Sequence, residues 1–232
     1  MSTPGSPDCP WLDQEALARL NPMLELLAKS HVSLSSVTDP DEARRIHVAD
    51  SLTGLALVEV RRASRALDLG AGGGFPGVPL AVFLPDCQVT LIDSVGRKVE
   101  FVNEVVSALG LKNAQAVKTR SEDWAVSEGR EAYDLVTARA VAPLSVLAEL
   151  ASPLLVEGGH LVAWKGEPEL EEEEIIATNR ESLGMEFDRR ETVVPYPGSR
   201  ERSLYVLTKA GPTPGGLPRR AGMARKRPLG RG

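Results

Sequence analysis

The spacing of hydrophobic residues divides the chain into a helical part and a part that alternates between strands and helices. Residues 12–30 carry their leucines at helical spacing, although Pro22 interrupts this stretch. Residues 39–60 form a second helical pattern, and Pro40 stands where the first helical position is expected. The polar, proline-rich residues 1–10 show no such pattern, so we predict that they are disordered.

From residue 65 onward, short apolar runs alternate with amphipathic stretches. Strands are predicted at 65–69, 88–93, 114–119, 133–138, 160–164, 187–194 and 203–209, and helices at 76–84, 96–109, 142–155 and 168–183. Strands that alternate with helices are typical of an α/β fold with a mostly parallel sheet. The last two strands follow each other closely, and we predict that they pair as an antiparallel edge.

These patterns divide the chain into four parts. They are a disordered N-terminus at 1–10, helices packed on the core at 11–62, an α/β domain at 63–210 and a basic C-terminal tail at 211–232. Glycine, proline and arginine dominate the tail, so we predict that it has no packed structure.

Composition narrows the class of protein further. Hydrophobic residues make up 42% of the chain and charged residues 25%, which is typical of a globular protein. No apolar run approaches the roughly 18–20 residues of a membrane span, and the N-terminus lacks the apolar core of a signal peptide. Cys9 and Cys87 are too few for a disulfide framework or a zinc site. We therefore expect a reduced, cytoplasmic protein without a metal.

The net charge of −5 hides an uneven distribution. The last 22 residues contain no acid and six basic residues, which are Arg219, Arg220, Arg225, Lys226, Arg227 and Arg231. The other 210 residues carry a net charge of −11, because 21 basic residues face 32 acidic ones. The net charge of the whole chain argues weakly against a polyanionic partner, whereas the basic tail favours one.

A glycine-rich turn follows the first predicted strand and can be aligned in two ways. Gly72, Gly74 and Gly77 fit the fingerprint of dinucleotide-binding proteins. Gly70, Gly72 and Gly74 after Asp68 fit the pattern of S-adenosylmethionine-dependent methyltransferases. A carboxylate repels a pyrophosphate but attracts the ammonium group of this sulfonium ligand, so Asp68 favours the second alignment. The turn also fits a plain strand–helix connection.

Polar residues stand after the next two strands. Asp93 ends the second strand, where a carboxylate can accept hydrogen bonds from ribose hydroxyls in either alignment or cap the following helix. Ser121 and Glu122 follow the third strand, where side chains of an open sheet can reach an adenine edge. Glu122 alone fits a solvated surface residue equally well.

Several segments together are specific enough to indicate a family. They are Asp68–Gly77, Leu91–Ser94 with Arg97 and Lys98, Val136–Leu144, His47–Leu52, Gly158–Gly166, Tyr196–Pro197 and Pro218–Leu229. Over roughly residues 15–230 the chain resembles the 16S (small-subunit) ribosomal RNA guanine-N7 methyltransferases, the RsmG or glucose-inhibited division protein B family. Ser33-Leu34-Ser35 departs from the family's Asn-Leu-Thr, which puts a role for that loop's amide in doubt.

The resemblance implies a class I, Rossmann-like methyltransferase fold with a seven-stranded sheet, an antiparallel edge and an N-terminal helical extension. It also implies S-adenosylmethionine as cofactor and makes residues 63–210 the methyltransferase domain. The implied cofactor contacts are Asp68, Gly70, Gly72, Gly74, Phe75, Asp93, Ser121, Glu122 and Arg139. Gly70 and Phe75 would line the methionine side, and Arg139 would lie between cofactor and substrate. The implied partner is 16S rRNA or the small ribosomal subunit, bound by a monomer with no membrane contact.

The implied reaction needs little from the protein in the way of proton transfer. Guanine N7 is an exposed acceptor that carries no proton, so direct in-line displacement requires no general base. Arg139 is the candidate catalytic residue, because its guanidinium can bind guanine O6, a phosphate or the cofactor carboxylate. The alternative for Arg139 is a structural salt bridge to Asp134 or Glu149.

Candidate RNA contacts lie at three places in the sequence. His47, Asp50 and Ser51 either form an RNA-facing group or lock a helix to the sheet. Lys165 ends the fifth strand and faces the carboxyl-end crevice, where ligands bind in open sheets. The remaining candidates are Arg200, Arg202, Arg219, Arg220, Arg225, Lys226 and Arg227.

Three other functions remain open on the sequence alone. A small-molecule or other RNA methyltransferase shares the fold, a nucleotide-dependent reductase is disfavoured by Asp68, and a non-catalytic RNA-binding factor is disfavoured by the intact glycine-rich turn.

Overall fold

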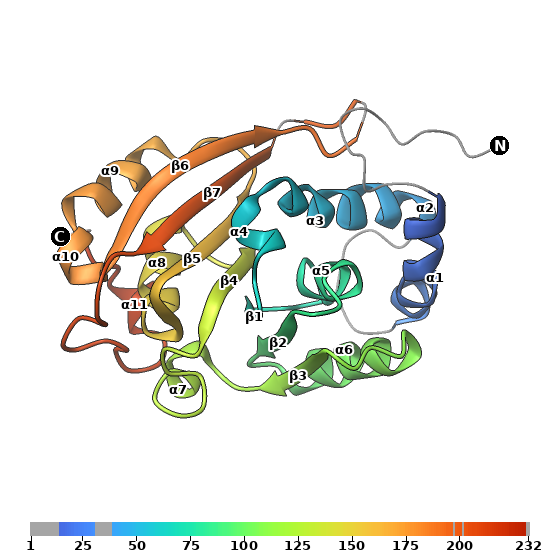
Figure 1. Ribbon diagram of the computed structural model, residues 1–232, viewed down its shortest axis with the longest axis horizontal. Helices are drawn as coiled ribbons and strands as arrows, with labels where there is room; N and C mark the ends of the chain where they lie inside the picture. The colour runs from blue at the N-terminus through green and yellow to red at the C-terminus, as the bar shows by residue number, and fades with distance from the viewer. Residues whose placement is uncertain (1–13, 31–38, 197, 201, 231–232) are drawn as a thin grey trace.

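A computed structural model describes residues 14–30, 39–196, 198–200 and 202–230. Its centre is a seven-stranded sheet in the order β3-β2-β1-β4-β5-β7-β6 (Figure 1). The strands are β1 (Arg65–Leu69), β2 (Gln88–Asp93), β3 (Ala114–Lys118), β4 (Tyr133–Arg139), β5 (Leu155–Lys165), β6 (Met185–Val193) and β7 (Arg202–Lys209). The first five strands are parallel, and β7 is antiparallel to both β5 and β6. The predicted fold class and antiparallel edge are confirmed.

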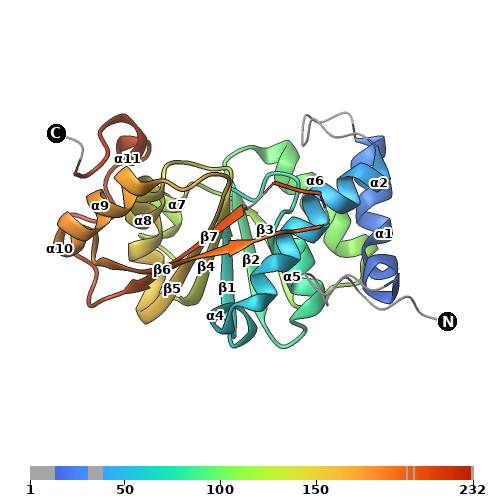
Figure 2. The same ribbon diagram turned by 90° about the horizontal axis from the view of Figure 1, so that it is seen from above.

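Helices cover both faces of the sheet (Figure 2). On one face lie α1 (Gln14–Lys29), α2 (Pro40–Ala43), α3 (Asp50–Leu52), α4 (Val58–Arg61), α5 (Gly77–Phe83) and α6 (Gly96–Ala108). The other elements are α7 (Ser121–Trp124), α8 (Leu144–Ala151), α9 (Leu170–Thr178), α10 (Arg180–Leu183) and α11 (Met223–Lys226). No helix of the described part of the chain is long and apolar enough to cross a membrane.

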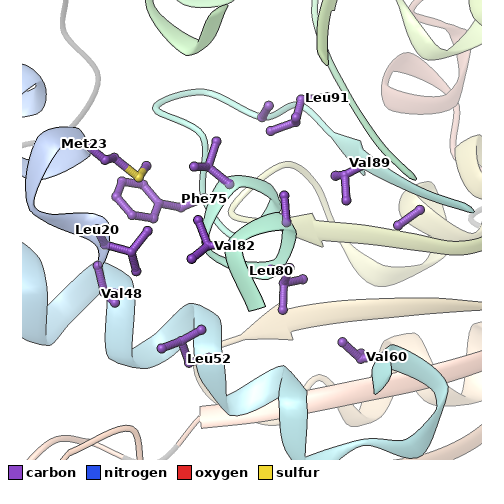
Figure 3. Close-up of a cluster of buried hydrophobic side chains, with 14 of the residues drawn as sticks. Leu20, Met23, Val48, Leu52, Val60, Phe75, Leu80, Val82, Val89 and Leu91 are labelled. Atoms are coloured by element: carbon purple, nitrogen blue, oxygen red, sulfur yellow. The ribbon is translucent and has the colours of Figure 1, made fainter. Parts of the chain in front are cut away.

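Successive residues of the central strands point to opposite faces and enter separate cores. Leu135 and Val162 belong to the core beneath α1, α3, α5 and α6, whereas Val136 and Ala163 belong to the core beneath α8. Figure 3 shows the first core, in which the Phe75 ring lies beside the Met23 side chain from α1. Strands that bury both faces read as nearly continuous apolar runs, which explains why their positions were predicted well.

The second N-terminal pattern is a bent chain of short elements rather than one helix. A π-helical turn at Arg44–Ala49 joins α2 to α3, and a 3-10 turn at Thr53–Ala56 joins α3 to α4. Trp164 packs tightly on Gly54, where a built Cβ would lie 2.5 Å from the indole ring. The bend therefore brings the segment into contact with β5, an interior strand of the sheet.

The C-terminal tail is packed, which corrects the prediction that it lacks structure. Its described residues, 211–230, continue from β7 to α11, which lies against α8. Ala224 is buried in the core beneath α8, and Leu217 is also buried. Composition alone misled here because a few apolar anchors and ion pairs are enough to hold a glycine-rich segment. The predicted disorder of residues 1–10 and the Ser33–Ser35 departure lie outside the described residues.

Candidate functional site

The carboxyl ends of β1 to β4 enclose a cavity of about 390 Å³, which we call the crevice. It lies at the point where the chain crosses from β1 to β2 on one side and to β4 on the other, the usual ligand position in an open α/β sheet. Its wall consists of Leu69, Gly70, Ile92, Asp93, Ser94, Val95, Lys98, Thr119, Arg120, Ser121, Glu122, Ala140, Val141, Leu150, Gly222 and Arg225. Four of the predicted cofactor residues, Gly70, Asp93, Ser121 and Glu122, are therefore brought together.

Asp68 lies beneath the glycine-rich turn rather than in the crevice wall. One carboxylate oxygen accepts the Gly77 N–H at 3.0 Å, and the other accepts the Thr137 hydroxyl at 2.9 Å. Burial raises the pKa of Asp68 to about 6. These contacts tie the turn to β4, so the structure gives Asp68 a role in shaping the turn instead of the predicted attraction for an ammonium group.

Asp93 fastens the turn to the end of β2 and lines the crevice. Its carboxylate accepts the Gly72 N–H at 3.1 Å and the Val95 N–H at 2.9 Å. Lys98 Nζ lies 3.9 Å from the same carboxylate. Each carboxylate oxygen has two acceptor sites, so Asp93 keeps capacity for a ligand hydroxyl while it also caps the following segment.

We expect Asp93→Ala to weaken cofactor binding strongly. The substitution removes a charged acceptor from the crevice and releases the Gly72 N–H, and a hydrogen bond to a charged group contributes about 1.5–3 kcal/mol. The dissociation constant for S-adenosylmethionine should rise at least about tenfold, since 1.4 kcal/mol corresponds to a factor of ten. Isothermal titration calorimetry measures it, and an unaltered constant would exclude the assignment.

The third side of the crevice combines β3, α7 and the C-terminal tail. The Ser121 hydroxyl donates to one oxygen of Glu122, at 3.0 Å, and the Gly222 N–H donates to the other, at 2.6 Å. Ser121 and Glu122 are predictable from the sequence, whereas Gly222 was not predicted as a wall residue. The family segment Pro218–Leu229 was the signal in the sequence that could have indicated Gly222. Nothing in the sequence placed that segment beside β3.

Arg139 ends β4 but turns away from the crevice. Its Nη1 donates to Asp50 Oδ2 at 2.9 Å, and its guanidinium lies 5.2 Å from the centre of the Phe75 ring. Neither predicted structural partner is correct, because Asp134 accepts from Ser64 and Glu149 pairs with another arginine. Phe75 likewise packs in the core rather than in the crevice wall.

The group around Arg139 locks the N-terminal helices to the sheet. Asp50 is 7% exposed, and its backbone carbonyl accepts the Trp164 indole N–H at 2.9 Å. Ser51 is fully buried and donates to the His47 carbonyl, so it cannot face RNA. Burial and the Arg139 charge lower the pKa of His47 to about 4. Of the two alternatives left open by the sequence, the structure favours the lock.

Asp50 also faces a second arginine. Arg202 Nε lies 3.8 Å from Asp50 Oδ1, and that oxygen has no hydrogen-bond partner among the described residues. Among the described residues, two guanidinium groups therefore face the single carboxylate of Asp50.

Two other predicted phosphate contacts are engaged within the protein. Lys165 Nζ donates to the Ala142 carbonyl and to Glu169, at 2.5 and 3.1 Å, and its side chain is 10% exposed. Arg219 makes a bidentate ion pair with Glu149. The remaining candidates in the tail, Arg220, Arg225, Lys226 and Arg227, are exposed, as is Arg200. Lys98 and Arg120, which line the crevice, add cations to its rim.

Residues 13–200 match the family described as rRNA small subunit methyltransferase G, GidB. The chain belongs to this family. A protein of Staphylococcus carnosus named ribosomal RNA small subunit methyltransferase G is 39% identical over 206 residues, or 85% of this chain and 83% of that protein. Its namesake from Lactobacillus delbrueckii subsp. bulgaricus is 42% identical over 205 residues, or 86% and 84%.

Solved structures agree with this family in fold. Fibrillarin from Aeropyrum pernix, in complex with natively bound S-adenosyl-L-methionine, has a TM-score of 0.52 and 17% identity over 69% of this chain and 73% of that chain. A SAM-dependent methyltransferase from Aquifex aeolicus has a TM-score of 0.52 and 22% identity over 73% and 94%. At this identity the likeness shows the class I fold, which the GidB family chain shares.

Proposed function

We propose that this protein transfers the methyl group of S-adenosylmethionine to N7 of a guanine in small-subunit ribosomal RNA. The observation that carries the proposal is the crevice at the switch point of the sheet, which is lined by Gly70 of the glycine-rich turn and by two carboxylates and is bordered by cations. The family match and the resemblance of the motifs supply the substrate. We further propose that the protein acts as a monomer in the cytoplasm.

The residues of the crevice fit the proposed cofactor. Gly70 and Gly72 adopt φ of +72° and +57°, and their lack of side chains lets a ligand approach the turn closely. Asp93 would hold the ribose hydroxyls, and Ser121 and Glu122 would face the adenine. When bound, the cofactor supplies an electrophilic methyl group on a sulfonium sulfur.

The protein's contribution to the reaction is orientation rather than proton transfer. Neither a cysteine nor a histidine is among the described residues that line the crevice, and guanine N7 has no proton to lose. Holding the two reactants in line can lower a barrier by about 7–11 kcal/mol in favourable cases. Arg139 is not part of the crevice wall, but Ala140, the next residue, is. We propose that the Arg139 guanidinium, fixed by Asp50 and Phe75, contacts the RNA substrate beside the crevice.

The chemistry predicts an unusually flat pH dependence above neutrality. His47 is neutral and Asp68 is ionised above pH 7, given their pKa values of about 4 and about 6, so neither group changes charge between pH 7 and pH 9. Below pH 6, Asp68 takes a proton and becomes a weaker acceptor for the Gly77 N–H. Because burial raises the pKa of Asp68 above its ordinary value, this protonation favours the folded state and relieves the cost of a buried charge. Single-turnover rates at saturating RNA measure this; a tenfold rise between pH 7 and pH 9 would contradict base-free transfer.

Transfer of a radiolabelled methyl group decides between the candidate functions. The substrates are deproteinised 16S rRNA, intact small subunits and, as a control, transfer RNA. The proposal expects label in 16S rRNA or in the small subunit. The labelled guanine should become a site of chemical strand cleavage that is specific for N7-methylguanine. Cofactor binding without transfer to any RNA would overturn it, and transfer to another position of the base would overturn the N7 assignment.

A further inference from the structure

The C-terminal residues 217–229, which we call the clasp, lie over one side of the crevice. Ala224 is buried in the core beneath α8, and Leu229 packs against the same core. Leu217 is also buried. Figures 1 and 2 show α11, within the clasp, beside α8. The clasp thus docks on the domain through only a few apolar contacts.

One ion pair holds the clasp to α8 and closes it on itself. Arg219 Nε and Nη2 donate to the two oxygens of Glu149, at 2.6 and 2.5 Å, and Glu149 is 3% exposed. Arg219 Nη2 also donates to the Arg227 carbonyl at 2.8 Å, across the base of the clasp. A bidentate pair of this kind fixes geometry as well as supplying energy, so Arg219 is the residue that sets the position of the clasp.

The inner side of the clasp is part of the crevice wall. The Gly222 N–H donates to Glu122, and Arg225 Nη2 donates to the Val141 carbonyl at 3.2 Å. Gly222 and Arg225 both line the crevice. A ligand that contacts Glu122 or Val141 therefore meets residues whose positions depend on the docked clasp.

The outer side of the clasp carries exposed cations. Arg220, Arg225, Lys226 and Arg227 are all exposed, and Arg225 belongs to both sides because it also lines the crevice. The described residues 217–229 contain no acid to neutralise these charges. Such a surface fits phosphate groups of an RNA backbone.

We propose that the clasp couples the two ligands: cofactor in the crevice stabilises the docked clasp, and the docked clasp presents its cations to RNA. Arg219 is then a positioning residue that acts through Glu149. The proposal rests on the proposed function for the identity of the RNA. Because linkage is reciprocal, RNA must raise cofactor affinity by the same factor by which the cofactor raises RNA affinity.

Limited proteolysis of the wild-type protein tests whether a ligand in the crevice stabilises the docked clasp. This test requires no methyl transfer. Trypsin cleaves after Arg219, Arg220, Arg225 and Lys226 when the clasp opens, and intact-mass spectrometry detects the loss of the C-terminus. S-adenosylhomocysteine should slow this cleavage about fivefold or more, the lower end of typical coupling between sites. Cleavage after Arg180, an exposed residue of α10, serves as the internal reference. Equal relative cleavage with and without the ligand would overturn the proposal.

Two neighbouring arginines provide matched variants that test whether the docked clasp couples ligand binding to RNA binding. Arg219→Ala removes the anchor, whereas Arg220→Ala removes an exposed charge next to it. Arg219→Ala should raise the dissociation constant for S-adenosylhomocysteine about tenfold. It should also abolish the difference in RNA affinity between protein with and without this ligand. Arg220→Ala should weaken RNA binding but leave ligand affinity and the coupling factor unchanged.

The outcomes separate the inference from the proposed function. Equal ligand affinity in wild type and Arg219→Ala would overturn the clasp, as would a coupling factor that Arg219→Ala leaves unchanged. If RNA is bound but never methylated, the proposed function fails while the clasp measurements still stand. Circular dichroism checks that Arg219→Ala is folded, and the wild-type proteolysis decides the question if it is not.

Discussion

Arg139→Ala should reduce methyl transfer at least about 100-fold, a typical loss when one positioned donor is removed from an active site. It should also lower the free energy of unfolding by about 3 kcal/mol, the lower end of the cost of unpairing a buried charge. Among the charged groups that the structure describes, Asp50 would lose its 2.9 Å partner and keep only Arg202, at 3.8 Å. Urea denaturation measures the stability. Radiolabelled methyl groups incorporated into RNA that is collected on filters measure the transfer.

Two further variants separate the structural role of Arg139 from its proposed chemical one. Arg139→Lys keeps the charge but loses the planar contact with Phe75, so it should recover stability only in part. Arg139→Met combined with Asp50→Leu removes both charges of the pair and should recover most of the stability, because replacing a whole buried pair is often neutral. Methyl transfer in this double variant should stay as low as in Arg139→Ala. Wild-type activity in the double variant would show that Arg139 serves the fold alone.

The strands of the sheet were predictable because burial on both faces leaves continuous apolar runs. β1 and β2 lie at their predicted positions, Arg65–Leu69 and Gln88–Asp93. The start of β5 was missed, because Gly158 and Gly159 interrupt the apolar run after Leu155. The pairing with β4 is irregular at that place, between Tyr133 and Leu135, which a pattern of alternating residues does not reveal.

Positions in the site were predictable wherever the backbone alone determines them. Gly70, Asp93 and Ser121 follow adjacent parallel strands, so their meeting at one edge of the sheet follows from strand order. The direction of a long side chain does not follow from strand order. Arg139 reaches Asp50, 89 positions earlier in the chain, and no spacing within the sequence indicates that contact.

The pairing of charged side chains near the crevice could not be predicted from the sequence either. Lys165 and Arg219 were counted as candidate phosphate contacts, yet each meets a glutamate, Glu169 and Glu149 respectively. Counting basic residues overestimates the cations available to RNA, because pairing within the fold is invisible in a sum. The tail shows the opposite error, since its composition concealed the anchors that hold it against α8.

Gly77→Ala should lower the free energy of unfolding by about 3 kcal/mol, which combines overpacking with a lost hydrogen bond to a charged group. A Cβ at this position would lie 2.6 Å from Leu91 Cδ2 and 2.7 Å from Asp68 Oδ2. Both neighbours are fully buried and cannot give way, so the turn must move and its N–H must leave Asp68. Because Gly70 of the same turn lines the crevice, cofactor affinity should fall by more than about tenfold.

Gly72→Ala is the matched control for this prediction. Gly72 has φ of +57°, but the nearest atom to a built Cβ is the Gly70 carbonyl oxygen, at 3.8 Å. The Gly72→Ala substitution should therefore lower the free energy of unfolding by roughly 1–2 kcal/mol, through backbone strain and without a steric clash. Thermal or urea unfolding of the two variants ranks them directly. If Gly77→Ala is no less stable than Gly72→Ala, close packing of the turn on Asp68 and Leu91 does not hold the crevice in shape.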